Sequence, residues 1–220
     1  MGAPAPLTPE SCAVLLLKQR YNPEIIPQLE AYVAAQCKGN TYDLDANLAL
    51  LKLYQFHPDT TNVEVVSKIL LKALMKLPST DYITCSYLIP ERVQEMELIA
   101  SINALASLLE TCSFRQVWGA LAPLRKESLA GLPGFDAAVR DFVCVSMSIT
   151  YQAIPLAHLR ESLALEGSEL TAFIKARGWT VEGEVVRVTL NDDNQAKPKK
   201  PDEGGAIRFD QMTKILASVV

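Results

Sequence analysis

The chain has 220 residues, of which 49% are hydrophobic and 21% are charged, and its formal net charge is -4. This length is enough for a sizeable hydrophobic core in one or two domains. The acidic balance argues against a protein whose whole surface is built to bind nucleic-acid phosphate, because such proteins carry a basic excess.

Targeting signals are weak in this sequence. The aliphatic run at 13–17 is far shorter than the roughly 20 apolar residues that a membrane helix needs. No basic stretch precedes it and three prolines crowd the start, so we expect neither a signal peptide nor a membrane anchor. The five cysteines are at least 25 residues apart, a spacing typical of buried free thiols in a reducing compartment. We therefore expect a cytoplasmic protein.

Capping residues and prolines divide the first part of the chain into helix-length segments. Thr8, Asn22, Asp43 and Asn62 each stand where a side-chain oxygen can accept hydrogen bonds from the free N–H groups of a following helix. Apolar residues then recur at helical spacing within each segment. The pattern predicts helices over 9–20, 24–39, 43–57 and 63–77.

The same logic predicts four more helices before residue 148. Asp81 begins a short one, and 91–112 carries a long apolar stripe that indicates one uninterrupted helix. Ser113 caps the next, in which Pro123 is expected to kink or end the helix. A turn at Gly131–Gly134 precedes the last. Because helices joined by short connections pack as antiparallel neighbours, residues 1–148 are predicted to form an α-helical superhelix.

After residue 148 the pattern changes. Residues 149–154 are β-branched and aromatic, as in a short strand. Two helices follow, one starting at Pro155 and one capped by Ser168. A hairpin turning at Glu182-Gly183 comes next, with Val186, Val188 and Leu190 expected on one face. Strand, helix, helix and hairpin is the order of a winged helix, which we assign to residues 149–190.

The remaining residues are predicted to form a mobile linker and a short helix. Residues 191–208 have too few apolar side chains to offset the entropy of ordering them. Residues 209–220 are amphipathic, and a helix this short must dock on its own domain or on a partner to be stable. The predicted protein-interaction residues are those of its apolar stripe: Phe209, Met212, Ile215, Leu216 and Val219.

Nothing in the sequence predicts a catalytic, metal or cofactor site. Neither His57 nor His158 has a second ligand-type residue at metal spacing, and the glycines form no phosphate-binding motif. The cysteines are best interpreted as small core residues. A Cys–His pair that meets only in the folded state leaves a thiol enzyme open as a distant alternative.

The winged helix leaves nucleic-acid binding open as a second alternative. In DNA-binding members the second helix of the pair enters the major groove. Here that helix offers Lys175 and Arg177 against two glutamates, and the wing has two glutamates beside Arg187. This balance removes much of the counterion release that drives binding to phosphate.

Several long segments resemble a known family. The segments RYNPE (20–24), YDLDANLALLKLYQF (42–56), ILLKAL (69–74), LLETC (108–112) and ITYQ (149–152) closely resemble the family of subunit K of eukaryotic translation initiation factor three. The likeness extends from about residue 20 to residue 179. Residues 1–19 and 191–205 match it poorly.

This resemblance implies a fold and a function. It implies a mainly α protein, with a HEAT-like, PCI-type helical superhelix followed by a winged helix and a C-terminal helix. It implies a non-catalytic scaffold subunit that acts in translation initiation, beside subunit L and, through the complex, on the small ribosomal subunit. It also implies that C-terminal helices of several subunits gather in one bundle, which suits residues 209–220. A winged helix that binds RNA directly stays the alternative.

Overall fold

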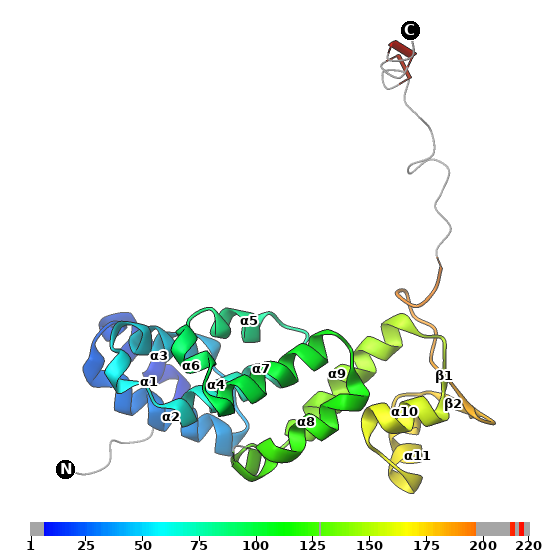
Figure 1. Ribbon diagram of the computed structural model, residues 1–220, viewed down its shortest axis with the longest axis horizontal. Helices are drawn as coiled ribbons and strands as arrows, with labels where there is room; N and C mark the ends of the chain where they lie inside the picture. Colours follow the sequence, from blue (N-terminus) through cyan, green and yellow to red (C-terminus); the bar gives the residue numbers. More distant parts are fainter. Residues whose placement is uncertain (1–6, 128, 197–211, 214–215, 218–220) are drawn as a thin grey trace.

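The computed structural model describes residues 7–127, 129–196, 212–213 and 216–217. The described chain is mainly α-helical and elongated, with a helical part at one end and a small mixed unit at the other (Figure 1). This confirms the predicted mainly α class. Successive helices lie beside one another in the order α1 (Pro9–Gln19), α2 (Ile26–Gly39), α3 (Leu44–Phe56), α4 (Val63–Leu74), α5 (Asp81–Ser86), α6 (Glu91–Gln94), α7 (Glu97–Glu110), α8 (Phe114–Glu127) and α9 (Phe135–Thr150).

The predicted caps start the first four helical segments. Thr8 forms a capping box with Ser11, Asp43 accepts from the N–H of Ala46, and Asn62 caps α4. Asn22 caps a 3₁₀ turn, η1 (Pro23–Ile25), that leads into α2. Two further 3₁₀ turns, η2 (Pro58–Thr60) and η3 (Leu129–Gly131), connect helices. The side-chain oxygens fix these starts because they satisfy N–H groups that have no partner within the helix.

The core of the helical part surrounds α4. Nine of its twelve residues are buried, and it packs against α2, α5 and α7. A helix with most of its residues buried lies in the middle of its neighbours. Its one buried charge, Lys72, is only 3% exposed and donates to Asn40 Oδ1 at 3.3 Å. Burial lowers the pKa of Lys72.

Two helix predictions differ from the structure in the middle of the chain. The segment 91–112 is not one helix, because Met96 adopts an extended conformation between α6 and α7. Gln94 donates to the carbonyls of Ser86 and Ile89, which holds α6 against the end of α5 and turns the chain there. Pro123 does not end its helix, since α8 continues to Glu127.

The second unit has the strand order of a winged helix. Strand β1 (Ala153–Pro155) is followed by α10 (Leu156–Leu163), α11 (Gly167–Ala176), β2 (Thr180–Glu182) and β3 (Val185–Arg187). The sheet is antiparallel in the order β1-β3-β2, with Ile154 and Val181 both opposite Val186. Ile154 and Val186 are fully buried beneath the two helices.

The start and the end of this unit differ from the prediction. Helix α9 runs through Thr150, so Ile149 and Thr150 are helical and β1 begins only at Ala153. Ser168 lies within the first turn of α11, whose cap position is Glu166. Leu190 is 60% exposed and does not join Val188 on the buried face, because β3 ends at Arg187.

Residues directly after the hairpin are fixed to the end of α9. Asn194 donates to the carbonyls of Ser148, Tyr151 and Thr189, and Asn191 donates to Ser148. The carbonyls in the last turn of a helix have no partner within it, and these two amides satisfy one of them. The folded part therefore continues to Asn194, inside the segment predicted as linker. The rest of that segment, from residue 197, lies outside the described residues.

Candidate interaction surfaces

The ionisable side chains of the described residues do not converge on one site. Within residues 7–127 and 129–196, no three His, Cys, Asp or Glu side chains lie close enough together to hold a metal ion. His57 ends α3, where its N–H donates to the carbonyl of Leu53 at 2.8 Å. His158 lies on α10 and contacts Arg115 of α8. The two histidines thus occupy different parts of the fold.

The thiols divide into a buried set and one exposed residue. Burial raises the pKa of Cys12 to about 11 and the pKa of Cys85 and Cys144 to about 12, and it also raises the pKa of Cys37. A nucleophilic cysteine needs a depressed pKa and access to substrate. Cys112 is exposed, contrary to the prediction that all five thiols are buried. Its φ of 56° in the turn between α7 and α8 removes it from the apolar stripe of α7.

Carboxylates neutralise much of the basic charge of the winged helix. Arg177, the residue directly after α11, forms an ion pair with Asp141 of α9, and it also lies over the ring of Phe173. Arg187 of β3 pairs with Glu182 of β2 at 2.9 Å. Phosphate would have to compete with these carboxylates for both guanidinium groups. The surface is therefore poorly suited to counterion release.

We expect titration of the purified chain with single-stranded RNA to give weak binding that depends little on salt. With both arginines paired, few phosphates are neutralised, and the slope of log K against log salt falls to about -2 or shallower. The matched variant Asp141→Asn with Glu182→Gln frees both arginines and should steepen the slope. Tight binding of the parent chain with a steep slope would contradict this prediction.

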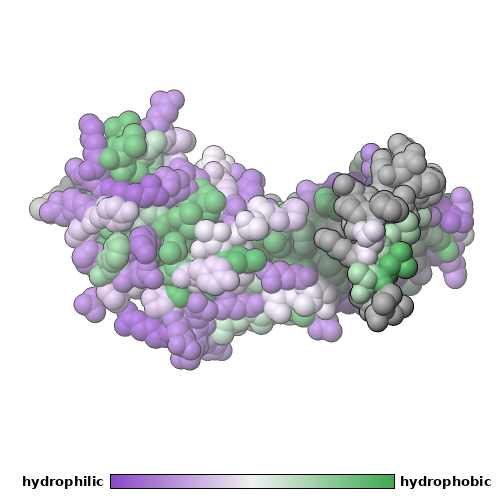
Figure 2. Space-filling view, turned by 90° about the horizontal axis from the view of Figure 1, so that it is seen from above, coloured by the Kyte–Doolittle hydropathy of each residue, from purple (hydrophilic) through white to green (hydrophobic). Residues whose placement is uncertain are grey.

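Exposed apolar side chains gather at several separate places on the molecule. Figure 2 shows green patches divided by purple side chains over the helical part. On α1, Leu17 is 86% exposed, and Tyr21 follows at 65%. In α9, Val145 is 41% exposed and Ile149, one turn later, is 44% exposed. Where exposed apolar side chains are contiguous, they are typical of a contact surface.

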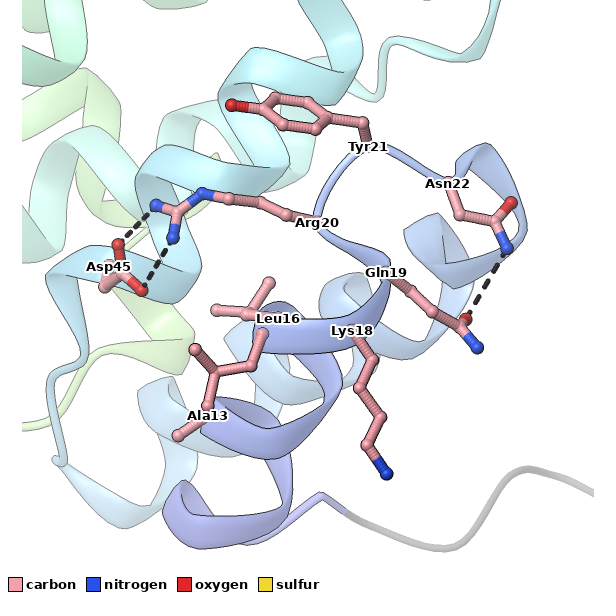
Figure 3. Close-up of a pocket in the computed structure, with 9 residues that line it drawn as sticks. Ala13, Leu16, Lys18, Gln19, Arg20, Tyr21, Asn22 and Asp45 are labelled. Carbon is pink, nitrogen blue, oxygen red and sulfur yellow. Dashed lines mark hydrogen bonds and ion pairs between the residues drawn. The ribbon is translucent and has the colours of Figure 1, made fainter.

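The first of these places is an N-terminal apolar surface made by Val14, Leu17, Tyr21 and Phe56. The ring of Tyr21 packs edge-on against that of Phe56 with centroids 6.1 Å apart. Beside it, a cleft of about 830 Å³ lies between the end of α1 and the start of α3. Figure 3 shows Arg20 reaching across this cleft to Asp45, while Tyr21 extends over α3. The sequence pattern missed this surface because its aromatic residues occur at the same spacing as core residues.

A second groove lies on the winged helix. It has a volume of about 480 Å³ between α10, α11 and β2, and Val181 is 47% exposed beside it. Apolar side chains make most of its wall, with Arg160 and Glu184 at its margin. Its residues come from β1, α10, α11, β2 and the turn after β2, which meet only in the fold, so helical or strand periodicity alone cannot predict it.

The C-terminal residues predicted to bind partners are only partly described. Met212 is 42% exposed and Leu216 is 64% exposed, and both are helical. Their four-residue spacing places them on the same face of a helix. Phe209, Ile215 and Val219 lie outside the described residues.

No helix among the described residues is long and apolar enough to cross a membrane.

Comparison with known proteins agrees with the predicted resemblance. The model of the CSN8/PSMD8/EIF3K family matches residues 60–200. The chain is 42% identical over 200 residues to eukaryotic translation initiation factor 3 subunit K of Homo sapiens, covering 90% of each chain. It is 39% identical to the protein of that name from Anopheles gambiae over 91% of this chain and 89% of the relative, and 38% identical to that from Bombyx mori over 93% of each. The chain belongs to the CSN8/PSMD8/EIF3K family.

Proposed function

We propose that this chain is a non-catalytic scaffold subunit of eukaryotic translation initiation factor 3 and acts in translation initiation in the cytoplasm. The observation that carries the proposal is the identity of about two residues in five to proteins named subunit K, over nine-tenths of both chains. The exposed apolar surfaces support a role in protein contacts, since such surfaces are a liability unless a partner covers them.

The partners proposed are the other subunits of the factor, with subunit L as the nearest neighbour. Contact with the small ribosomal subunit is proposed to occur through the assembled complex. The docking element is proposed to be the C-terminal helix, with Phe209, Met212, Ile215, Leu216 and Val219 as its binding stripe. An amphipathic helix that inserts its apolar face between partner helices is a common recognition mode.

The double variant Met212→Asp with Leu216→Asp tests this docking element. Each substitution places a charge on the apolar stripe, and burying an unpaired carboxylate in a helix bundle is strongly unfavourable. We expect the amount of tagged chain that co-purifies with the other subunits to fall severalfold. The free energy of unfolding of the isolated chain should stay within about 0.5 kcal/mol of the parent value.

A matched control separates loss of the stripe from added charge. Ala217→Asp with Ser218→Asp adds the same charge on the side of the helix away from the stripe, and should leave incorporation unchanged. If both double variants are incorporated as well as the parent chain, the helix is not the docking element. A sharp loss of stability in the isolated stripe variant would show instead that the helix packs on its own chain.

A further inference from the structure

The first helix of the helical part, α1, has an apolar outer face. It lies far from the winged helix (Figure 1) and packs chiefly on α3. Of its 11 residues only Cys12 and Leu16 are buried, while Val14 is 51% exposed and Leu17 is 86% exposed. In stacked helical arrays the terminal unit has a polar outer face, because that face meets water. Helix α1 instead presents the kind of face that inner helices of an array present to a neighbour.

Two exposed aromatic rings continue this face onto α3. Tyr21 packs edge-on against Phe56, and the two side chains are 65% and 53% exposed. Leu17 and Tyr21 both line the cleft of about 830 Å³ between the end of α1 and the start of α3. Figure 3 shows that this cleft is open above the backbone of both helices. The N-terminal apolar surface is therefore one contiguous area with a cleft beside it, and not a set of scattered side chains.

Basic side chains border the N-terminal apolar surface. The charged residues of the cleft lining are Lys18, Arg20 and Asp45, and Arg20 donates to Asp45 across the cleft. Lys52 of α3 lies over the ring of Phe56, with Nζ 5.1 Å from the ring centroid. Because Arg20 and Asp45 neutralise each other, the two lysines set the sign of the local charge. This border is positive on a chain whose formal net charge is -4.

We propose that the N-terminal apolar surface binds an acidic amphipathic helix of another protein. The walls of the cleft are helices, whose backbone groups are already paired, so they offer side chains and no sheet edge to a partner. A helix satisfies its own backbone and can dock through an apolar stripe. Carboxylates beside that stripe would meet Lys18 and Lys52, whereas basic residues there would be repelled. The docked helix covers the outer face of α1 as the next helix of the array.

Binding of three synthetic peptides to the purified full chain tests the proposal. Each peptide is an amphipathic helix of about 18 residues. All three have the same stripe of Leu and Phe, and the flanking positions are Glu, Gln or Lys. By fluorescence anisotropy at low salt we expect the Glu peptide to bind about tenfold tighter than the Lys peptide, with a preference that shrinks as salt is added. Equal or tighter binding of the Lys peptide, or no binding of any peptide, overturns the proposal.

Leu17→Ser locates the binding on the chain. It removes the most exposed apolar side chain of the surface without adding a charge, and should raise the Kd of the Glu peptide about tenfold. Its Tm should equal that of the parent chain, because the side chain is 86% exposed. Leu190→Ser is the matched control, since Leu190 is 60% exposed on the winged helix. If Leu17→Ser and Leu190→Ser bind the Glu peptide equally well, the N-terminal apolar surface is not its site.

The double variant Lys18→Gln with Lys52→Gln tests the charge of the partner. It keeps the apolar surface and removes both unpaired positive charges at its border, so the Glu peptide should bind no tighter than the Gln peptide. Lys38→Gln with Lys175→Gln is the matched control, because it removes two exposed lysines elsewhere on the chain. This control should keep the preference for the Glu peptide. A preference that survives in the first double variant overturns the assignment of an acidic partner.

Cross-linking distinguishes a foreign helix from a second copy of this chain. A carbodiimide joins an amine only to a carboxylate that touches it. In the complex purified from cells, we expect it to couple Lys18 and Lys52 to Asp or Glu residues of one helical segment in another protein, as read by mass spectrometry. Leu17→Ser should reduce this coupling severalfold. Coupling to a second copy of this chain, or no coupling outside the chain, overturns the proposal. The peptide measurements use the purified chain, so they stand whether or not it enters the proposed complex.

Discussion

Raising the pH from 8 to 11 is expected to unfold this protein cooperatively. Four buried thiols have a raised pKa, those of Cys12, Cys37, Cys85 and Cys144. Four phenols also have a raised pKa, those of Tyr32, Tyr42, Tyr54 and Tyr82. Burial is the largest cause of the raised pKa in all eight groups. In the unfolded chain the thiols ionise near pH 8.5 and the phenols near pH 10.

The direction of this pH dependence follows from the number of protons that the folded and the unfolded chain bind. Above pH 8.5 the unfolded chain loses thiol protons that the folded chain keeps, so the free energy of unfolding falls as pH rises. Each such group contributes about 1.4 kcal/mol per pH unit until its folded pKa is reached. The thiols of Cys12, Cys85 and Cys144, whose folded pKa is about 11 or 12, together remove roughly 4 kcal/mol between pH 9 and 10. This loss is a large part of the whole stability of a typical domain. Lys72, whose pKa is lowered, acts in the opposite direction but is a single group.

Denaturant unfolding under reducing conditions at several pH values measures this effect. We expect a midpoint of alkaline unfolding near pH 10–11, with the ultraviolet absorbance of tyrosinate rising in the same transition. Cys144→Ala should reduce the slope of unfolding free energy against pH by about 1.4 kcal/mol per unit. Cys112→Ala, at an exposed thiol, should not change the slope. A free energy that stays constant from pH 8.5 to 10.5 would contradict the prediction.

The second large effect is expected at the junction of the two parts, where Trp118→Ala should loosen the winged helix. The indole N–H of Trp118 donates to the carbonyl of Ser162 at 2.8 Å, and Arg140 Nε donates to that of Leu163 at 3.0 Å. Both acceptors lie in the last turn of α10, where carbonyls have no partner within the helix. The guanidinium of Arg140 also lies 5.0 Å from the ring of Trp118. One aromatic residue thus supports a hydrogen bond, a cation–π contact and packing.

Removing that side chain is expected to destabilise the docked winged helix by about 3 kcal/mol. Amide hydrogens of α10, α11 and β3 should then exchange roughly 100-fold faster, while those of α4 keep their protection. Trp118→Phe keeps an aromatic side chain but loses the hydrogen bond and the second ring of the indole, so its effect should be smaller, about 1–2 kcal/mol. Equal acceleration of exchange in α4 and α11 would show that the two parts unfold as one unit and would contradict this account.

Local chemistry made the helix starts predictable. Thr8, Asp43 and Asn62 act as caps in the structure as the sequence indicated, because a cap depends only on an oxygen and the next few N–H groups. The hairpin was predictable for a similar reason, since Gly183 with φ of 63° takes a conformation that most side chains disfavour. Each of these features is decided within about four residues.

Contacts between distant residues account for the features that were mispredicted. The break at Met96 follows from hydrogen bonds of Gln94 to α5, and helix α9 runs into the predicted strand because buried Met147 fixes its last turn. The exposure of Cys112 follows from the turn between α7 and α8. The pattern of apolar residues is the same whether such a turn is present or not.

The amino-acid sequence by itself determined the mainly α class, the caps, the strand–helix–helix–hairpin order and the family, because these depend on local spacing and on long matching segments. Only the tertiary structure decided which apolar residues stay exposed, as Leu17 and Tyr21 do, and which basic groups are neutralised, as Arg177 is by Asp141. It alone brought Tyr21 and Phe56 into contact. Exposure and charge pairing depend on which elements meet in space, and residues more than 30 positions apart carry no local signal of that meeting.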